Sequence, residues 1–295
     1  MISIVLPLFN GRAFIEETLR SLETQTYWDA ELIVVDDGST DDGAELAEKI
    51  CRESSSPILR SLKLIKKANG GVAEARNVGI KEAKGEYVAL LDQDDLWAAD
   101  RLEKTLAAVK SENARWAYSA FFRFYADGRR VLKDDGERDG KKALEKIVRG
   151  ELFIPPAAAL IEKSLLEEVG AFVPAFAPSD DWDLFLKLAE KERGAYLGEP
   201  LVFFRSHKTS TGKKQRDRIF MAQEEVLRLH EPKLKTLVPA SALSFRRSRI
   251  YLHLAQVFSE KEKEKAGRYF KMALKERPMR VKCWTIYLKF LLGIK

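Results

Sequence analysis

Three aspartates follow a short apolar run in the segment EYVALLDQDDLW. Residues 87–91 predict a buried strand, and Asp92, Asp94 and Asp95 come directly after it. Asp92 and Asp94 are two residues apart, so their side chains point the same way if the extended backbone continues. Two carboxylates at this spacing can bind Mn²⁺ or Mg²⁺, with the oxygens of a substrate diphosphate completing the coordination. The alternative is an acidic turn that caps the next helix, and an isolated D-x-D does not decide between the two.

Two further groups of residues capable of chemistry lie later in the chain. The segment SDDWD, residues 179–183, opens a predicted amphipathic helix. The structural alternative to a catalytic role is that Ser179 and Asp180 cap that helix and that the negative charge of Asp183 interacts favourably with the helix dipole. His207 follows a predicted strand at residues 201–205, where it could bind a metal, although a lone histidine is more often a surface or packing residue.

The first 98 residues predict the sheet that must position these side chains. Four apolar strands alternate with three amphipathic helices, which indicates a parallel α/β sheet. Ligands of such sheets bind beyond the carboxyl ends of the strands, and these ends are polar and turn-rich at residues 7–10, 36–39, 66–71 and 92–95. The segment has neither the G-x-G-x-x-G turn of a dinucleotide site nor a P-loop. Dehydrogenases and ATPases are therefore poor candidates.

The pattern changes after residue 99. Residues 116–125 and 129–132 predict a hairpin around Asp127 and Gly128, and the last third predicts only helices. We therefore predict a domain at residues 1–215, with a donor half at 1–98 and an acceptor half at 99–215, followed by a helical C-terminal region at 216–295. Specificity for the sugar and for the acceptor is expected in loops such as residues 149–158 and 207–214.

Composition limits the cellular setting. The 295 residues are 45% hydrophobic, and we find no signal peptide and no apolar run long enough to span a membrane. Two distant cysteines suit a reducing compartment, so we expect a cytoplasmic protein. The net charge of +6 is compatible with nucleic acid, anionic lipid or phosphorylated substrates, and does not choose among them.

Several blocks of this chain, in this order, resemble the family 2 glycosyltransferases of bacterial cell-surface glycan type, which have the GT-A fold. They are SIVLPLFN, ELIVVDDGSTDDG, NGGVAEARNVGI, GEYVALLDQDDLW, EEVGAF and SDDWDLFLKLA. Together they cover roughly residues 1–210 and are far more specific than any single block. The resemblance implies an inverting hexosyl- or N-acetylhexosaminyltransferase that uses a nucleotide-diphosphate sugar, with a UDP-sugar expected, and a divalent metal, Mn²⁺ or Mg²⁺. The acceptor would be a glycan or lipid-linked acceptor, and nucleic acid is not expected as a partner.

The resemblance also implies individual roles on the donor side. The donor-binding residues would be Pro7, Leu8, Phe9, Asp37, Arg76, Asp92 and Asp94. Asp37 would bind the nucleobase. Asp94 would be the direct metal ligand, with Asp92 beside it and His207 contacting metal or diphosphate.

On the acceptor side the SDDWD segment resembles the E-D-x-D helix start of the family. This implies that Asp181 is the catalytic base and that Asp180 and Trp182 bind the acceptor. The chain departs from the family at Asp180, where Glu is usual, so its acceptor contact is less secure than the role of Asp181.

Two other functions remain open at this point. A nucleotidyltransferase that makes an activated sugar would need a basic, Gly-rich loop after the first strand, where this chain has only Phe9-Asn10-Gly11-Arg12. A non-catalytic sugar- or nucleotide-binding module is suggested by the basic charge alone, and three acidic clusters argue against it.

The C-terminus suggests a membrane contact. Residues 279–295 place Val281, Trp284, Leu288 and Leu291 near one helical face, next to several cations. This pattern is typical of a helix lying in an anionic membrane surface, which would make the protein peripheral on the cytoplasmic face. The alternative is that this face packs on the preceding helix around Phe270.

Overall fold

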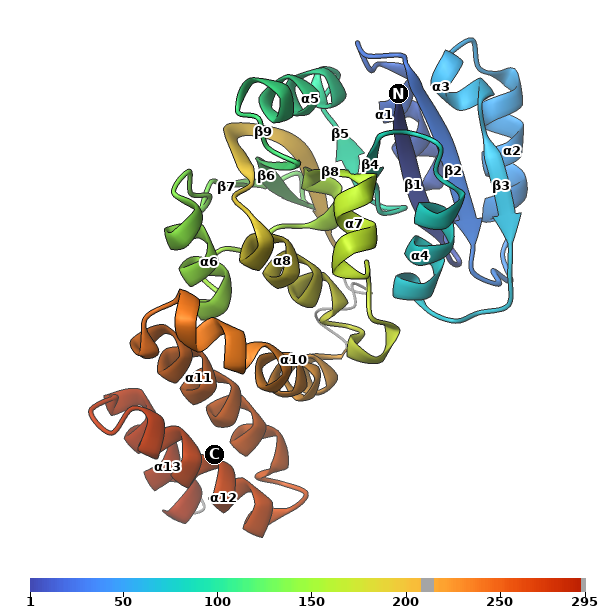
Figure 1. Ribbon diagram of the computed structural model, residues 1–295. Coiled ribbons are helices and arrows are strands. Elements are labelled where there is room, and N and C mark those ends of the chain that lie inside the picture. Colours follow the sequence, from blue (N-terminus) through green and yellow to red (C-terminus); the bar gives the residue numbers. More distant parts are fainter. Residues whose placement is uncertain (208–214, 293–295) are drawn as a thin grey trace.

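A computed structural model describes residues 1–207 and 215–292, and it contains one mixed sheet flanked by helices (Figure 1). The strand order is β3-β2-β1-β4-β8-β6-β9-β5, with β7 paired to β6. The first half alternates as the sequence predicts, through β1 Ile2–Leu8, α1 Ile15–Glu23, β2 Ala30–Asp36, α2 Gly43–Glu53, α3 Pro57–Arg60, β3 Lys63–Lys66, α4 Val72–Glu82 and β4 Tyr87–Leu90. All pairings among β1 to β4 are parallel. Their carboxyl ends therefore lie at one edge of the sheet.

Local sequence explains these elements. Every residue of β1 is buried, as expected for a strand covered on both faces. In α1 the residues Ile15, Leu19 and Leu22 recur at helical spacing and are fully buried. α4 begins after Gly71, whose φ of +93° is a conformation that other residues rarely adopt.

The second half turns the sheet from parallel to mixed. Its elements are β5 Leu96–Trp97, α5 Arg101–Ser111, β6 Trp116–Tyr125, β7 Arg130–Lys133, α6 Gly140–Arg149, the 3₁₀ turns Pro156–Ala158 and Pro174–Phe176, β8 Ala159–Glu162, α7 Lys163–Val169, α8 Asp180–Lys191 and β9 Ala195–Ser206. β8 runs antiparallel to both β4 and β6, and the predicted hairpin is confirmed as β6 and β7, with Gly128 at φ +81°. The strand predicted at residues 201–205 is longer than expected, because its earlier residues also pair with β6.

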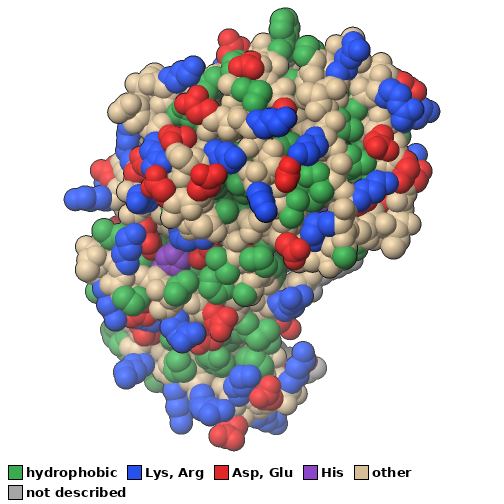
Figure 2. All heavy atoms as spheres, turned by 45° about the vertical axis from the view of Figure 1, so that its right-hand side comes forward, with side chains coloured by type: hydrophobic (Ala, Val, Ile, Leu, Met, Phe, Trp, Pro, Cys, Tyr) green, Lys and Arg blue, Asp and Glu red, His purple; other side chains and the backbone are tan. Residues whose placement is uncertain are grey.

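The last third consists of α10 Arg216–Leu237, α11 Ala240–Phe258, α12 Lys263–Glu276 and α13 Val281–Leu292, stacked below α6 and α8 (Figure 1). One hydrophobic core runs from the sheet through Leu184 and Phe185 of α8 into Val226 and Leu227 of α10. Figure 2 shows Lys and Arg side chains spread over this helical region among hydrophobic ones. The predicted α/β class, with flanking helices and a helical C-terminal region, is confirmed.

Parts of two predicted segments fall outside the described residues: 208–214 of the specificity loop expected at 207–214, and 293–295 of the C-terminal segment expected at 279–295. Among the described helices, none combines the length and the apolar character needed to cross a membrane.

Candidate active site

The polar ends of the first strands meet, as the parallel sheet requires. The backbone N–H of Phe9 donates to Gln93 Oε1 at 2.8 Å, and Gln93 Nε2 donates to the Phe9 carbonyl at 3.1 Å. Pro7 and Leu8 are buried in β1, whereas the Phe9 side chain is 45% exposed. Of the three predicted pocket residues, only Phe9 thus has an exposed side chain, and donor binding by the three stays a prediction. Gln93, inside the D-x-D, is a support that the sequence alone did not single out.

Asp37 organises the loop between β3 and α4. Its Oδ1 accepts from Lys67 Nζ at 2.7 Å and from the N–H of Gly70 at 2.9 Å, and its Oδ2 accepts from the N–H of Gly71 at 2.7 Å. A carboxylate has about four acceptor positions, so these three contacts leave roughly one for a ligand. Binding of a nucleobase by Asp37 stays a prediction, and the observed contacts show that this buried residue also holds the loop before α4.

Arg76 joins the two acidic segments that lie far apart in the sequence. Its Nη2 donates to Asp92 Oδ1 at 2.6 Å, and its Nη1 donates to Asp180 Oδ2 at 3.3 Å. Burial opposes the charge of Arg76, but the two carboxylates outweigh this effect and raise its pKa. Asp180 is 3% exposed and faces this arginine, so its acceptor contact stays a prediction. The D-x-D at the end of β4 and the start of α8 therefore form one site.

Asp181 lies beside this buried ion pair and is itself half-buried. Burial, together with the charge of Asp180, raises the pKa of Asp181 to about 7, although Arg76 acts in the opposite direction. A carboxyl group that titrates near neutral pH is suited to general base catalysis. The next residue, Trp182, donates its indole N–H to the carbonyl of Ile147 in α6 at 3.0 Å, which anchors the start of α8.

Two of the three predicted metal-binding residues are in contact. Asp94 Oδ2 lies 2.7 Å from His207 Nε2, whereas Asp92 is turned toward Arg76. Burial, with the charge of Asp92 adding to it, raises the pKa of Asp94. Carboxylate oxygens with one imidazole nitrogen fit a divalent cation such as Mn²⁺. Within residues 1–207 and 215–292 no three His, Cys, Asp or Glu side chains are grouped to hold a metal.

Arg205 supports this acidic turn and was not predicted. Its Nε donates to the carbonyl of Asp94 at 2.8 Å, and its backbone N–H donates to Asp95 Oδ1 at 2.9 Å. The β9 strand end thus holds the D-x-D turn from the acceptor half.

A second missed group lies below the site, between α8 and α10. His230 on α10 bonds through Nε2 to Asp183 Oδ1 at 2.9 Å and through Nδ1 to Glu190 Oε1 at 2.6 Å. Burial opposes the charge on this imidazole, but the two carboxylates raise the pKa of His230 to about 9. Asp183 lies in the first turn of α8, where its charge favours the helix dipole as the sequence suggested, and it is also a buried partner of a charged histidine. No local pattern marks His230, since both partners lie at least 40 residues away.

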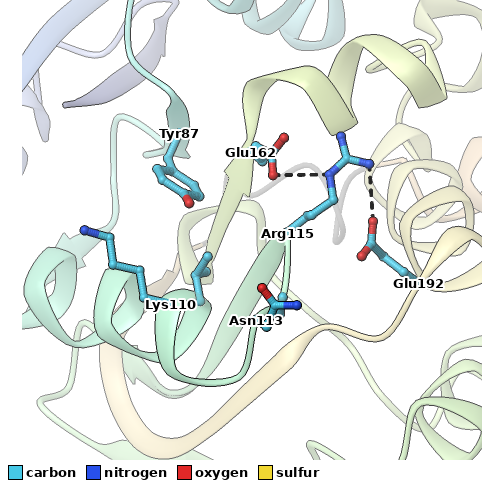
Figure 3. Close-up of a pocket in the computed structure, with 8 residues that line it drawn as sticks. Tyr87, Lys110, Asn113, Arg115, Glu162 and Glu192 are labelled. Carbon is cyan, nitrogen blue, oxygen red and sulfur yellow. Dashed lines mark hydrogen bonds and ion pairs between the residues drawn. The ribbon is translucent and has the colours of Figure 1, made fainter.

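A cavity of about 500 Å³ lies elsewhere (Figure 3). It is lined by Tyr87, the first residue of β4, and therefore lies near the amino end of that strand. Figure 3 shows Arg115 there between Glu162 and Glu192. Its guanidinium nitrogens lie 3.2 Å from a carboxylate oxygen of Glu162 and 3.4 Å from one of Glu192. The cavity contains none of the predicted site residues, and its arginine is already neutralised.

Comparison with known proteins agrees with this geometry. Residues 3–170 match the model of glycosyl transferase family 2. The glycosyltransferase GlyG of Streptococcus pneumoniae is 30% identical over 181 residues, which are 57% of this chain and 59% of GlyG. The chain spans from 20% to 59% of the length of the first two curated relatives that it matches.

Two solved structures share the fold. TarS 1-349 of S. aureus in complex with UDP-GlcNAc has a TM-score of 0.72 at 20% identity, covering 95% of this chain and 82% of that one. The mannosyltransferase PcManGT of Pyrobaculum calidifontis, in complex with GDP-Man and Mn²⁺, has a TM-score of 0.63 at 19% identity, covering 99% of this chain and 84% of that one. At these identities the likeness concerns the fold alone, and it confirms the GT-A type. With the family model matching more than half of its length, the chain belongs to glycosyl transferase family 2.

Proposed function

We propose that this chain is an inverting, metal-dependent glycosyltransferase that moves a sugar from a nucleotide-diphosphate sugar to a hydroxyl of a glycan or lipid-linked acceptor. The observation that carries the proposal is the position of Arg76, which contacts Asp92 at 2.6 Å and Asp180 at 3.3 Å. This contact supports the proposal because it joins the D-x-D to Asp180, the neighbour of the proposed base Asp181, and a transfer between two substrates requires donor and acceptor groups in one site.

The chemistry follows from the two sides of that site. For inversion, the acceptor oxygen attacks the anomeric carbon from the face opposite the leaving diphosphate. Asp181 accepts the proton of the attacking hydroxyl, and a pKa of about 7 leaves a usable fraction of this carboxylate ionised at neutral pH. Asp94 and His207 would hold the divalent cation, with Asp92 at the same strand end. A bound cation would supply positive charge for the departing diphosphate.

The family assignment and the two solved relatives support the donor class. One of those proteins binds UDP-GlcNAc and the other binds GDP-Man with Mn²⁺. A UDP-sugar is our expected donor for this chain, which makes it a hexosyl- or N-acetylhexosaminyltransferase.

A donor screen tests this function. We expect UDP-sugars with Mn²⁺ or Mg²⁺ to raise the melting temperature, because ligand binding stabilises the folded state. Slow release of UDP and free sugar should follow, with water as the acceptor. Pyrophosphate release from a nucleoside triphosphate and a sugar phosphate would instead indicate a nucleotidyltransferase. Stabilisation without any turnover, even when candidate acceptors are added, would indicate a binding module.

We also propose that the protein is peripheral on an anionic membrane surface through α13. The four residues of the face predicted from the sequence are exposed: Val281 by 76%, Trp284 by 45%, Leu288 by 51% and Leu291 by 59%. Phe290, on the adjacent face, packs on Phe270 with ring centroids 5.0 Å apart. An apolar stripe with flanking cations suits the interface of an anionic bilayer.

Vesicle sedimentation tests this contact. Leu288→Ser with Leu291→Ser should weaken binding to phosphatidylglycerol vesicles by about tenfold or more, because each leucine loses apolar burial in the interface. Leu229→Ser, at a position 63% exposed on α10, is the matched control and should bind like the wild type. Equal binding by all three proteins would contradict the proposal. Conversion of a dimer to a monomer by the double variant would assign the stripe to a second copy of the chain.

A further inference from the structure

Several arginines gather around one aromatic ring where α6 meets the C-terminal helices. The ring is that of Phe245 on α11. Four guanidinium carbons lie 4.2, 5.7, 5.3 and 5.6 Å from its centroid, those of Arg149, Arg249, Arg277 and Arg280 respectively. Together with the buried Arg246 of the same helix we call them the arginine cluster.

Few carboxylates balance this charge. Arg149 pairs with Glu151 at 2.9 Å and, more distantly, with Glu145 at 4.0 Å. For the other four arginines, no carboxylate within the described residues lies at ion-pair distance. The neighbouring Glu276 is engaged elsewhere, at 2.8 Å from Arg247. Among the described residues, acids therefore pair with only one of the five arginines, Arg149, and the positive charge of the other four stays concentrated here.

Two donors of the cluster also lack hydrogen bonds. Nε of Arg246 and Nη1 of Arg280 are buried and have no partner among the described residues. Arg249 donates to the Arg149 carbonyl at 3.3 Å, a long contact with a neutral acceptor. Burial, with the charge of Arg249 adding to it, lowers the pKa of Arg246 to about 9. A bound anion would offset the repulsion between these positive charges and accept hydrogen bonds from the two unpaired N–H groups.

The cluster begins at the residue that follows the proposed catalytic base in α8. The guanidinium of Arg246 lies 4.3 Å from the ring centroid of Trp182, the residue after Asp181. Gly150, at the end of α6, leaves room for this side chain, because a Cβ there would come within 2.1 Å of Arg246 Nη1. The positive charge thus extends from the start of α8 outward along α11 to the turn before α13.

We propose that the arginine cluster binds a phosphate group carried by the acceptor. Several guanidinium groups present paired N–H donors that match phosphate oxygens. Because Arg246 contacts Trp182 at the start of α8, an acceptor whose phosphate is held by the cluster can extend toward this helix end, which also carries Asp181. Only the assignment to the acceptor rests on the proposed function; anion binding itself rests on the arginines.

Titration with glycerol 3-phosphate tests the site, with glycerol as the neutral probe. Donor and metal are omitted, and the melting temperature is followed at low salt. The test variant is Arg249→Gln with Arg280→Gln. The matched control, Arg228→Gln with Lys271→Gln, removes the same charge from exposed positions of α10 and α12. We expect glycerol 3-phosphate to stabilise the wild type and the control, and to bind the test variant at least about tenfold more weakly.

Equal responses of the three proteins, or equal stabilisation by glycerol, would overturn the proposal. If the test variant does not fold, Arg249→Lys with Arg280→Lys keeps the charge and should still weaken binding, because lysine cannot make the paired contact. Binding by this lysine variant as tight as that of the wild type would then overturn the proposal.

Sedimentation with phosphatidylglycerol vesicles separates the two possible sources of the phosphate. Loss of vesicle binding in the test variant, along with loss of the glycerol 3-phosphate response, assigns a lipid phosphate. Loss of the glycerol 3-phosphate response alone assigns a soluble phosphorylated acceptor. An unchanged glycerol 3-phosphate response contradicts the proposal whatever the vesicles do. Failure of the proposed function would show separately, as absence of UDP-sugar turnover by the wild type.

Discussion

The pH dependence of turnover is the prediction that follows most directly from the environment of Asp181. If Asp181 is the base, only its ionised form supports reaction. With a pKa of about 7, roughly 1% of the carboxyl groups are ionised at pH 5 and roughly 90% at pH 8. We therefore expect turnover to rise about a hundredfold between these values. An aspartate with the ordinary pKa of 3.8 would be more than about 90% ionised throughout and would give a nearly flat profile.

The assay is UDP-sugar hydrolysis at saturating donor and Mn²⁺ or Mg²⁺, from pH 5 to 8.5. Donor affinity is measured at each pH by a separate binding titration, so that protonation of Asp94 near the metal is not mistaken for loss of the base. Asp181→Asn should retain donor binding and lose about a hundredfold or more in turnover at pH 8. Its residual rate should lack the rise near pH 7.

A substitution at Asp180 tests the direction in which this neighbour shifts the pKa of Asp181. The charge of Asp180 raises the pKa of Asp181, so Asp180→Asn should move the midpoint of the profile to lower pH. A flat profile for the wild type at saturating donor, or a profile unchanged by Asp181→Asn, would refute the reasoning. Loss of donor binding in Asp181→Asn would place this residue in the donor site instead.

Two further predictions concern the metal and the helical region. Asp94→Asn should abolish metal-dependent donor binding in a calorimetric titration while leaving the melting temperature nearly unchanged. The control is Asp127→Asn, in the exposed β6–β7 turn. Equal donor affinity in both variants would contradict the role of Asp94 as a metal ligand. The pKa of His230 rises from 6.5 to about 9 on folding, which contributes up to about 3 kcal/mol of stability that is fully present below pH 6.5 and is lost as the pH rises through 9. Urea unfolding should show this loss in the wild type and not in His230→Gln, and identical pH dependence in the two proteins would exclude a charged His230.

The strand ends of the donor half were predictable because short-range patterns determine them. Each apolar run that ends in Asp, Asn or Gly marks the carboxyl end of a parallel strand, and four such ends must share one edge of the sheet. The contact of Phe9 with Gln93 is a direct consequence of that arrangement. The hairpin at Gly128 was predictable for a similar reason, since the turn chemistry is local.

The buried polar contacts could not be predicted in the same way. Arg76 binds partners 16 and 104 residues away, and nothing in its neighbourhood shows that it would join the two acidic segments. His230 lies in an ordinary helical pattern and acquires its role only from the packing of α10 on α8. The two-residue strand β5 depends entirely on its pairing with β9. The sequence could not decide which face of the C-terminal helix is buried. Its hydrophobic residues occupy two adjacent faces, and only packing against α12 determines which of them is buried.

The anomeric form of the released sugar tests the central claim most directly. Proton NMR can follow the hydrolysis of an α-linked UDP-sugar with Mn²⁺ before the free sugar equilibrates. If Asp181 activates the attacking oxygen from the face opposite the diphosphate, the first sugar to appear must be the β-anomer, and its formation must slow by about a hundredfold or more in Asp181→Asn. Initial release of the α-anomer would contradict inverting transfer by this site.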